Sequence, residues 1–225
     1  MAAGLAAFML IGPGFASVET FNTNVGEQRT IALKDGSMVL LDTATKIEVR
    51  LSAHRRNIEL VQGRAHFEVA KDTSRPFVVA GGERSVTAVG TVFDVARAPD
   101  QTSVLLTEGK VLLRYGEASR FMVPGDRVVF RGDRMTIDRP AVDAQTAWLT
   151  GRTVFEAQPL LEVVAELNRY SSRPLVLGDR KVAEMRISGT YKTGDVGAFA
   201  VSVSSLLPID VTTQPDRVVL HARER

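Results

Sequence analysis

Apolar and polar residues alternate with a period of two along most of the first 138 residues. Ile47, Val49 and Leu51 lie on one face of such a stretch, and the residues between them are charged. Alternation over four to eight residues that ends at turn residues predicts half-buried β-strands. The interruptions fall at residues 35–36, Gly63, residues 75–76, residues 81–82 and Gly90.

About a dozen short strands with no intervening helical pattern predict an all-β domain over residues 18–143. Closely spaced strands of this kind form a sandwich, a barrel or a solenoid. Several segments recur at similar length, which favours a solenoid-like arrangement over a sandwich, although no strict repeat can be written down.

The hydrophobic period changes after a linker at residues 139–146. Leu160, Val163, Val164 and Leu167 recur at helical spacing, which predicts a helix over residues 159–170. A second helix is predicted at residues 195–206. Strands are predicted at residues 153–155, 175–177, 185–191, 209–212 and 218–221. The order βαβ-βαββ predicts a small α+β domain over residues 144–225, so the fold class of the whole chain is mainly β.

Residues 1–17 differ in composition from the rest of the chain. The first sixteen are apolar and uncharged, but they are fewer than the roughly 20 residues that a membrane-spanning helix needs. One interpretation is a secretory leader cleaved after Ala16, although no Lys or Arg supplies the usual charged beginning. The other, which we favour with the resemblance given below, is the outer half of a truncated membrane anchor.

Composition and charge exclude several classes of function. The 225 residues carry a formal net charge of +2, with both signs interspersed, so no basic stripe for nucleic acid is present. The chain has no cysteine, which excludes disulfides and thiolate metal sites. We therefore expect no nucleic-acid partner and no cofactor.

No group of residues points to catalysis or metal binding. His54, His66 and His221 are far apart in sequence, without a metal-ligand spacing. Asp35 and Asp42, with Asp72, could be imagined as paired carboxylates, but the sequence gives no reason for them to converge. We expect neither catalytic nor metal residues, and hence no enzyme.

Two other features have a structural interpretation. Arg55-Arg56 is interpreted as an exposed turn and not as an anion site. Trp148 opens the second predicted domain without a neighbouring aromatic residue, so we interpret it as a packing contact between the domains.

A set of motifs in a fixed order covers both predicted domains. In the first they are LKDGS at 33–37, VQGRAHFEV at 61–69, RPFVV at 75–79, VGTVFDV at 89–95 and EGKV at 108–111. In the second they are WLTGR at 148–152, Phe155, Pro159-Leu160, residues 163–170 and ISGTY at 187–191. As a set, these motifs resemble the periplasmic region of the FecR family of transmembrane anti-sigma regulators. The second domain resembles the short domain of secretins and TonB-dependent transducers.

The resemblance implies a role in cell-surface signalling in a Gram-negative bacterium. It implies a periplasmic region, anchored in the inner membrane by an N-terminal helix, that binds the signalling domain of a TonB-dependent outer-membrane receptor. The signal, typically for iron–siderophore uptake, would pass to an extracytoplasmic-function sigma factor. The cytoplasmic segment that holds the sigma factor in this family has no counterpart in the sequence.

The expected functional surface is therefore a protein-binding one. An exposed edge strand can accept a strand from a partner through main-chain hydrogen bonds. We predict such an edge at residues 209–212 or 218–221, because these strands are short and β-branched with few protecting charges, Arg217 being the exception. The alternative is that both strands are paired within the domain. The candidate partner-binding residues are Ile209, Asp210, Val211, Thr212, Val218, Val219 and Leu220.

Two alternative functions belong to other classes. A β-helical enzyme acting on polysaccharide would need a cleft with several carboxylates or basic groups. A secretion-system component would assemble into rings.

Overall fold

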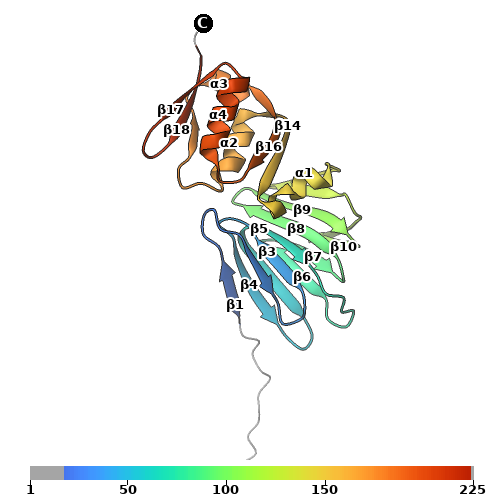
Figure 1. Ribbon diagram of the computed structural model, residues 1–225. Coiled ribbons are helices and arrows are strands. Elements are labelled where there is room, and N and C mark those ends of the chain that lie inside the picture. Colours follow the sequence, from blue (N-terminus) through green and yellow to red (C-terminus); the bar gives the residue numbers. More distant parts are fainter. Residues whose placement is uncertain (1–17, 224–225) are drawn as a thin grey trace, which may run out of the picture.

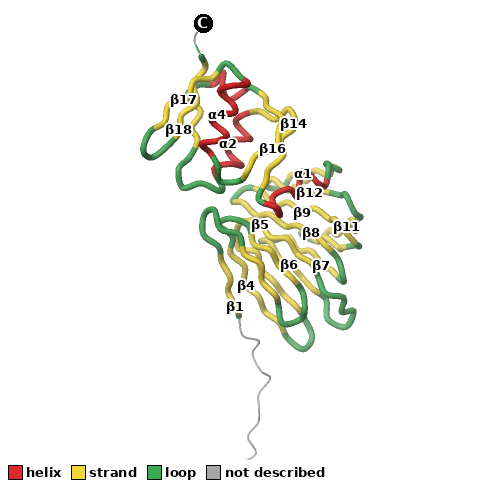
Figure 2. The backbone as a smooth tube through the Cα atoms, viewed as in Figure 1, coloured by secondary structure: helices red, strands yellow, loops and turns green. Residues whose placement is uncertain are grey.

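A computed structural model describes residues 18–223 as two lobes joined by a short helical connection (Figures 1 and 2). The large lobe holds strands β1 to β13, and the small lobe holds β14 to β18 with helices α2, α3 and α4. The predicted anchor or leader at residues 1–17 lies outside the described residues. Within residues 18–223, no helix has both the length and the apolar character needed to cross a bilayer.

The large lobe is a single thirteen-stranded sheet. Its strands are β1 (Glu19–Asn22), β2 (Arg29–Ala32), β3 (Met38–Leu41), β4 (Lys46–Leu51), β5 (Arg56–Glu68), β6 (Phe77–Gly81), β7 (Arg84–Ala88), β8 (Val92–Ala98), β9 (Gln101–Glu108), β10 (Val111–Tyr115), β11 (Ala118–Met122), β12 (Arg127–Arg131) and β13 (Arg134–Asp138). One half of the sheet has the order β1-β4-β5-β6-β7-β10-β11, and the other has the order β2-β3-β5-β8-β9-β12-β13. Strand β5 belongs to both halves.

The two halves curl over one hydrophobic core. Phe67 on β5 contacts Phe77 of the first half at 6.1 Å and Phe93 of the second half at 5.2 Å between ring centroids. Tyr115 and Phe130 make a similar contact across the halves at 5.5 Å. The alternating apolar positions predicted from the sequence face this core.

Gly63 bends β5 where the strand passes from one half of the sheet to the other. Its φ is +92°, and a Cβ atom there would lie 2.3 Å from Thr45 Oγ1, so only glycine fits. The pairing between β4 and β5 shifts register at this point. The sequence interpretation of Gly63 as the end of a strand was wrong, because the residue interrupts the alternation without ending the ladder.

The predicted linker at residues 139–146 is partly helical. Helix α1 (Val142–Thr146) is followed by a 3-10 turn at Ala147–Thr150, and Gly151 ends it in the left-handed conformation at φ +70°. Trp148 in this turn is only 2% exposed. The connection is therefore packed against its surroundings and is not an open linker.

The small lobe closely follows the predicted order of elements. It consists of β14 (Arg152–Pro159), α2 (Leu160–Asn168), β15 (Leu175–Leu177), α3 (Arg180–Glu184), β16 (Arg186–Lys192), α4 (Val196–Leu206), β17 (Ile209–Thr213) and β18 (Val218–Ala222). Only α3, a single turn with Asp179 as its N-cap, was not predicted. Helices α2 and α4 pack on strands β15, β17 and β18, around a core separate from that of the large lobe (Figure 1).

The prediction of a mainly β chain is confirmed. The large lobe does not adopt the solenoid-like arrangement that the sequence favours. Coils of a solenoid would pair in parallel, whereas all strand pairs of the large lobe except β5–β6 are antiparallel. The curled sheet with a shared core is closer to the sandwich alternative.

Candidate functional site

The structure separates the two candidate edge strands. The small-lobe sheet has the order β15-β18-β17, so β17 is an edge and β18 is the central strand. The suggestion that residues 218–221 form an edge was wrong. The main-chain groups of Val218, Val219 and Leu220 lie between two paired neighbours and cannot accept a further strand. Ile209, Asp210, Val211 and Thr212 do lie on an edge.

The register shows which groups of β17 are free for a partner. Val218 N–H donates to Pro174 O at 2.9 Å, and Leu220 O accepts from Gly178 N–H at 2.8 Å, so both residues face β15. Their antiparallel partners on β17, Thr213 and Val211, consequently direct their backbone groups away from β18. Val211 and Thr213 are the hydrogen-bonding positions of the free edge.

The remaining outward position of β17 is already occupied. Ile209 N–H donates to Leu207 O at 2.7 Å, and Ile209 O accepts from the Arg223 guanidinium at 3.0 Å. Arg223 also pairs with Asp210 at 2.9 Å. A partner strand would therefore meet open backbone only from Val211 onward.

The opposite edge of the same sheet is capped by a side chain at its first residue. Asn168 at the end of α2 accepts from Leu175 N–H at 2.8 Å and donates to Leu175 O at 2.9 Å. The amide thereby occupies both outward groups of the first residue of β15. A natural protein protects exposed strand edges in this way, which makes the open β17 edge the more notable.

A second group of polar residues joins the lobes, and we call it the interlobe cluster: Asp42, Arg64, Glu166, Arg169 and Tyr170. Asp42 is fully buried and accepts from Arg64 at 2.8 Å, from Arg169 at 2.9 Å and from the Tyr170 hydroxyl at 2.9 Å. Arg64 also pairs with Glu166 at 3.1 Å and donates to Tyr170. One aspartate of the large lobe thus binds the end of α2.

The electrostatics of the cluster follow from its burial and its pairing. Burial alone would raise the pKa of Asp42, but Arg64 and Arg169, with a hydrogen bond from Gln28, hold it below its ordinary value. Burial raises the pKa of Tyr170, so its hydroxyl stays protonated and donates to Asp42. Asp42 is therefore ionised at neutral pH and faces a neutral Tyr170 hydroxyl.

Further hydrogen bonds and a ring contact surround this cluster. Gln28 donates to Asp42 at 3.0 Å and to the backbone oxygen of Trp148 at 3.0 Å, and Thr43 donates to Arg169 O at 2.9 Å. The Arg64 guanidinium lies 4.6 Å from the centroid of the Trp148 ring. Trp148 is therefore a packing residue between the lobes.

A cleft of about 520 Å³ opens beside the cluster, between β12 of the large lobe and β14 and α2 of the small lobe. It adjoins a smaller cavity of about 300 Å³ that shares Arg64, Trp148, Glu166 and Arg169. Five arginines from both lobes line the larger cleft: Arg64, Arg127, Arg131, Arg152 and Arg169.

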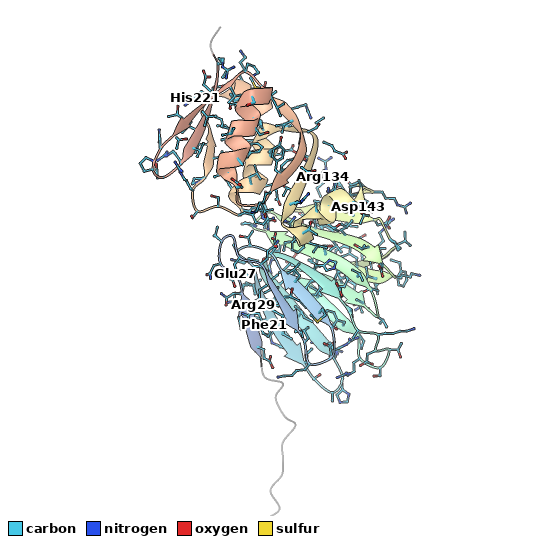
Figure 3. The ribbon with its side chains drawn as sticks, in the orientation of Figure 1. Phe21, Glu27, Arg29, Arg134, Asp143 and His221 are labelled. Carbon is cyan, nitrogen blue, oxygen red and sulfur yellow. The ribbon has the colours of Figure 1, made fainter. Side chains whose placement is uncertain are left out.

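The histidines do not converge. His66 on β5 lies 3.2 Å from Asp94, whereas His221 lies on β18 in the small lobe (Figure 3). Across residues 18–223, no group of three or more His, Asp or Glu side chains is arranged to hold a metal ion. The three aspartates considered as a carboxylate pair each bind a different arginine: Asp35 binds Arg56, Asp42 binds Arg64 and Asp72 binds Arg75.

The interpretation of Arg55-Arg56 as an exposed turn was wrong for Arg56. Its side chain is fully buried, donates to Asp35 at 2.8 Å and to Ala70 O at 2.9 Å, and holds the loop before β6. No sequence pattern indicated this pairing or the interlobe cluster, because neither set of residues is close in sequence.

Comparisons with known proteins identify a family model and solved structures that this chain resembles. Residues 19–112 match a protein-family model described as FecR protein. No curated protein matches the chain. Two crystal structures of a proposed anti-sigma factor from Parabacteroides distasonis, at 2.50 Å and 1.65 Å resolution, superpose with TM-scores of 0.79 and 0.80. Each is 23% identical and covers 92% of this chain and 100% of the other, and at this identity the likeness establishes the two-lobed fold.

Proposed function

We propose that this chain is the signal-receiving region of an anti-sigma regulator, because residues 19–112 match a family model described as FecR protein. Its fold matches that of a proposed anti-sigma factor along the whole length of that protein. The partner on the output side would be an extracytoplasmic-function sigma factor. The region would lie in the periplasm on a protein anchored in the inner membrane.

The input partner we propose is the signalling domain of a TonB-dependent outer-membrane receptor, in a pathway of iron–siderophore type. The observation that carries this part is the free edge of β17. Val211 and Thr213 offer two N–H and two C=O groups in an extended strand, next to a sheet whose other edge is capped by Asn168. An edge of this kind binds an extended segment by strand addition.

The proposed site also suits a reversible contact. The added strand would meet Val211 and Thr213 through their backbones, and the exposed Thr212 side chain would lie beside it. Main-chain hydrogen bonds give affinity without demanding one particular partner sequence. The residues that remain as candidates are Asp210, Val211 and Thr212, together with Thr213.

The test uses the purified full chain and the purified signalling domain of the TonB-dependent receptor encoded next to its gene. Val211→Pro removes one outward N–H and projects a ring from the free edge, so we expect binding to weaken by about tenfold or more. Val211→Thr keeps the backbone donor and serves as the matched control, with an expected change below about threefold. Biolayer interferometry measures both affinities, and circular dichroism verifies the fold of each variant.

Equal affinities of Val211→Pro and the wild-type chain would refute the edge as the docking site. Failure of the wild-type chain to bind the receptor domain would refute the proposed input partner. The assignment to an anti-sigma regulator is tested separately, by deleting the gene in the host and measuring transcription from promoters of the neighbouring sigma factor.

A further inference from the structure

The interlobe cleft contains arginines that the fold does not neutralise. Within residues 18–223, Arg131 donates only to the Gln101 side chain at 2.9 Å, and Arg152 has no carboxylate partner. The residue directly opposite Arg152 on β16 is Lys192, which has the same charge. Like charges at directly opposed positions of an antiparallel pair are destabilising, so this arrangement costs stability in the free protein.

Buried donors that lack partners lie in the same walls. Trp148 is 2% exposed and Thr153 is 6% exposed, and both line the cleft. Trp148 Nε1 and Thr153 Oγ1 have no hydrogen-bond partner in the part of the chain that the structure describes. A buried polar group without a partner costs about 1–3 kcal/mol. Neither atom has surface that a ligand in the cleft could reach, so the feature that matches a ligand rich in acceptor oxygens is the pair of unneutralised guanidinium groups.

The other arginines of the cleft do not compete for this role. Arg64 and Arg169 are paired with Asp42 and Glu166, and Arg127 makes a two-bond contact with Asp138. The acidic residues on the wall, Glu162 and Glu166, both come from α2. Among residues 18–223, the arginines of the cleft without a carboxylate partner are therefore Arg131 on one lobe and Arg152 on the other, while Glu162, which accepts from Gln158 at 3.2 Å, lies on the same wall.

We propose that this cleft binds a small polyanion carrying carboxylate or phosphate groups, held by Arg131 and Arg152. Guanidinium groups bind both kinds of oxyanion through paired N–H donors. The volume of about 520 Å³ is that of a small-molecule site and not of a protein interface. A ligand that bridges Arg131 and Arg152 contacts both lobes and stabilises their present arrangement. This site is independent of the β17 edge.

The first test is calorimetric titration of the full chain with citrate and, separately, with inorganic pyrophosphate at low ionic strength. In the double variant Arg131→Gln, Arg152→Gln we expect the affinity for the bound probe to fall by about tenfold or more. The matched control is the double variant Arg55→Gln, Arg134→Gln, which removes the same charge outside the cleft (Arg134 is labelled in Figure 3). We expect the control to bind within about threefold of the wild-type chain.

Binding of citrate alone identifies a carboxylate ligand, binding of pyrophosphate alone identifies a phosphate ligand, and either outcome supports the site. Absence of binding by both probes at millimolar concentration refutes it. An equal loss in the cleft variant and in the control also refutes it, because binding would then depend on net charge only.

Discussion

Two buried arginine–aspartate pairs in this protein have similar chemistry and different roles. Arg56 and Asp35 lie within the large lobe, and the arginine also donates to the backbone oxygens of Ala70 and Arg75. Arg64 and Asp42 are equally close, at 2.8 Å, but apart from Gln28 their other side-chain partners belong to the small lobe. The first pair stabilises the fold of the large lobe, and the second holds the two lobes together.

The two pairs differ in how readily water can replace the partners of the arginine. The three backbone oxygens that bind Arg56, those of Ala70, Asp72 and Arg75, belong to the same lobe as the arginine, whose side chain is fully buried. Two of the side chains in the cluster around Arg64 are partly exposed, since Glu166 and Arg169 keep 28% and 31% of their side-chain surface, whereas Asp42 and Tyr170 are buried. Water can replace these partners if the lobes separate. The interlobe cluster is therefore the contact that can open while each lobe stays folded.

The largest effect is expected from breaking the pair inside the large lobe. Arg56→Met leaves Asp35 buried without its counter-ion and three carbonyls without a donor, which should cost about 3–5 kcal/mol of unfolding free energy. Urea unfolding followed by circular dichroism measures this loss. Arg75→Met is the control, because the Arg75–Asp72 pair is partly exposed and should contribute less than about 1 kcal/mol. Similar losses in both variants would contradict the distinction.

The bend that brings Arg64 beside Asp42 is the next most sensitive position. Gly63→Ala places a Cβ atom 2.5 Å from Thr45 Cα at a positive φ, so we expect a loss of about 2–4 kcal/mol by the same measurement. Gly116→Ala has a positive φ as well but open space around it, and should cost only about 1 kcal/mol. Tolerance of Gly63→Ala would show that the strand can pass between the halves without this bend.

Asp42→Asn tests the interlobe pair. The amide cannot neutralise Arg64 and Arg169, so the contact between the lobes should weaken by about 2 kcal/mol. The only tryptophan of the chain, Trp148, lies at this contact, and its fluorescence reports the opening. We expect the fluorescence transition at lower urea while hydrogen exchange of the β5 and β8 amides is unchanged. Loss of protection in these strands would place Asp42 in the fold of the large lobe instead.

Acid should open the same contact. The folded-state pKa of Asp42 is below its ordinary value, so its contribution is complete above that ordinary value and is lost as the pH falls through the lower, folded one. We expect the Trp148 transition to shift to lower urea below about pH 4 in the wild-type chain. In Asp42→Asn this part of the pH dependence should be absent.

The smallest effect is expected at His66, and its pH dependence is opposite to that of Asp42. Burial would lower its pKa, but the hydrogen bond and charge of Asp94 and the charge of Glu68 raise it above the ordinary value. The contribution of the charged form is thus present below about pH 6.5 and is lost as the pH rises through the raised value. His66→Gln should remove about 0.5–1 kcal/mol at pH 6 and less at pH 8, measured by urea unfolding. A loss that is larger at pH 8 than at pH 6 would contradict the conclusion that the charged form of His66 stabilises the fold.

Most of the secondary structure follows from the alternation of residues. The helix at residues 159–170 and the strand at 209–212 were predicted within two residues, because their apolar positions face a core on one side only. Helix α3 was missed because one turn is too short to show a period. The continuity of β5 was missed because a glycine that bends a strand and one that ends it give the same local pattern.

The sequence predicted the strands of the candidate site but not their order in the sheet. The β-branched composition of residues 209–212 and 218–221 identified both strands but could not order them in the sheet. That order depends on β15, which is parallel to β18 and lies more than forty residues earlier. The interlobe cluster had no signal, since Asp42 and Tyr170 are 128 residues apart.

The sequence by itself determined the mainly β class, most of the elements and the FecR resemblance, because period, turn residues and motif order are properties of neighbouring residues. Tertiary structure alone decided which edge is open, which aspartate binds which arginine and where the arginines of two lobes meet. Those features depend on contacts between distant segments, and a charged residue has the same local pattern whether its partner is water or a buried counter-ion.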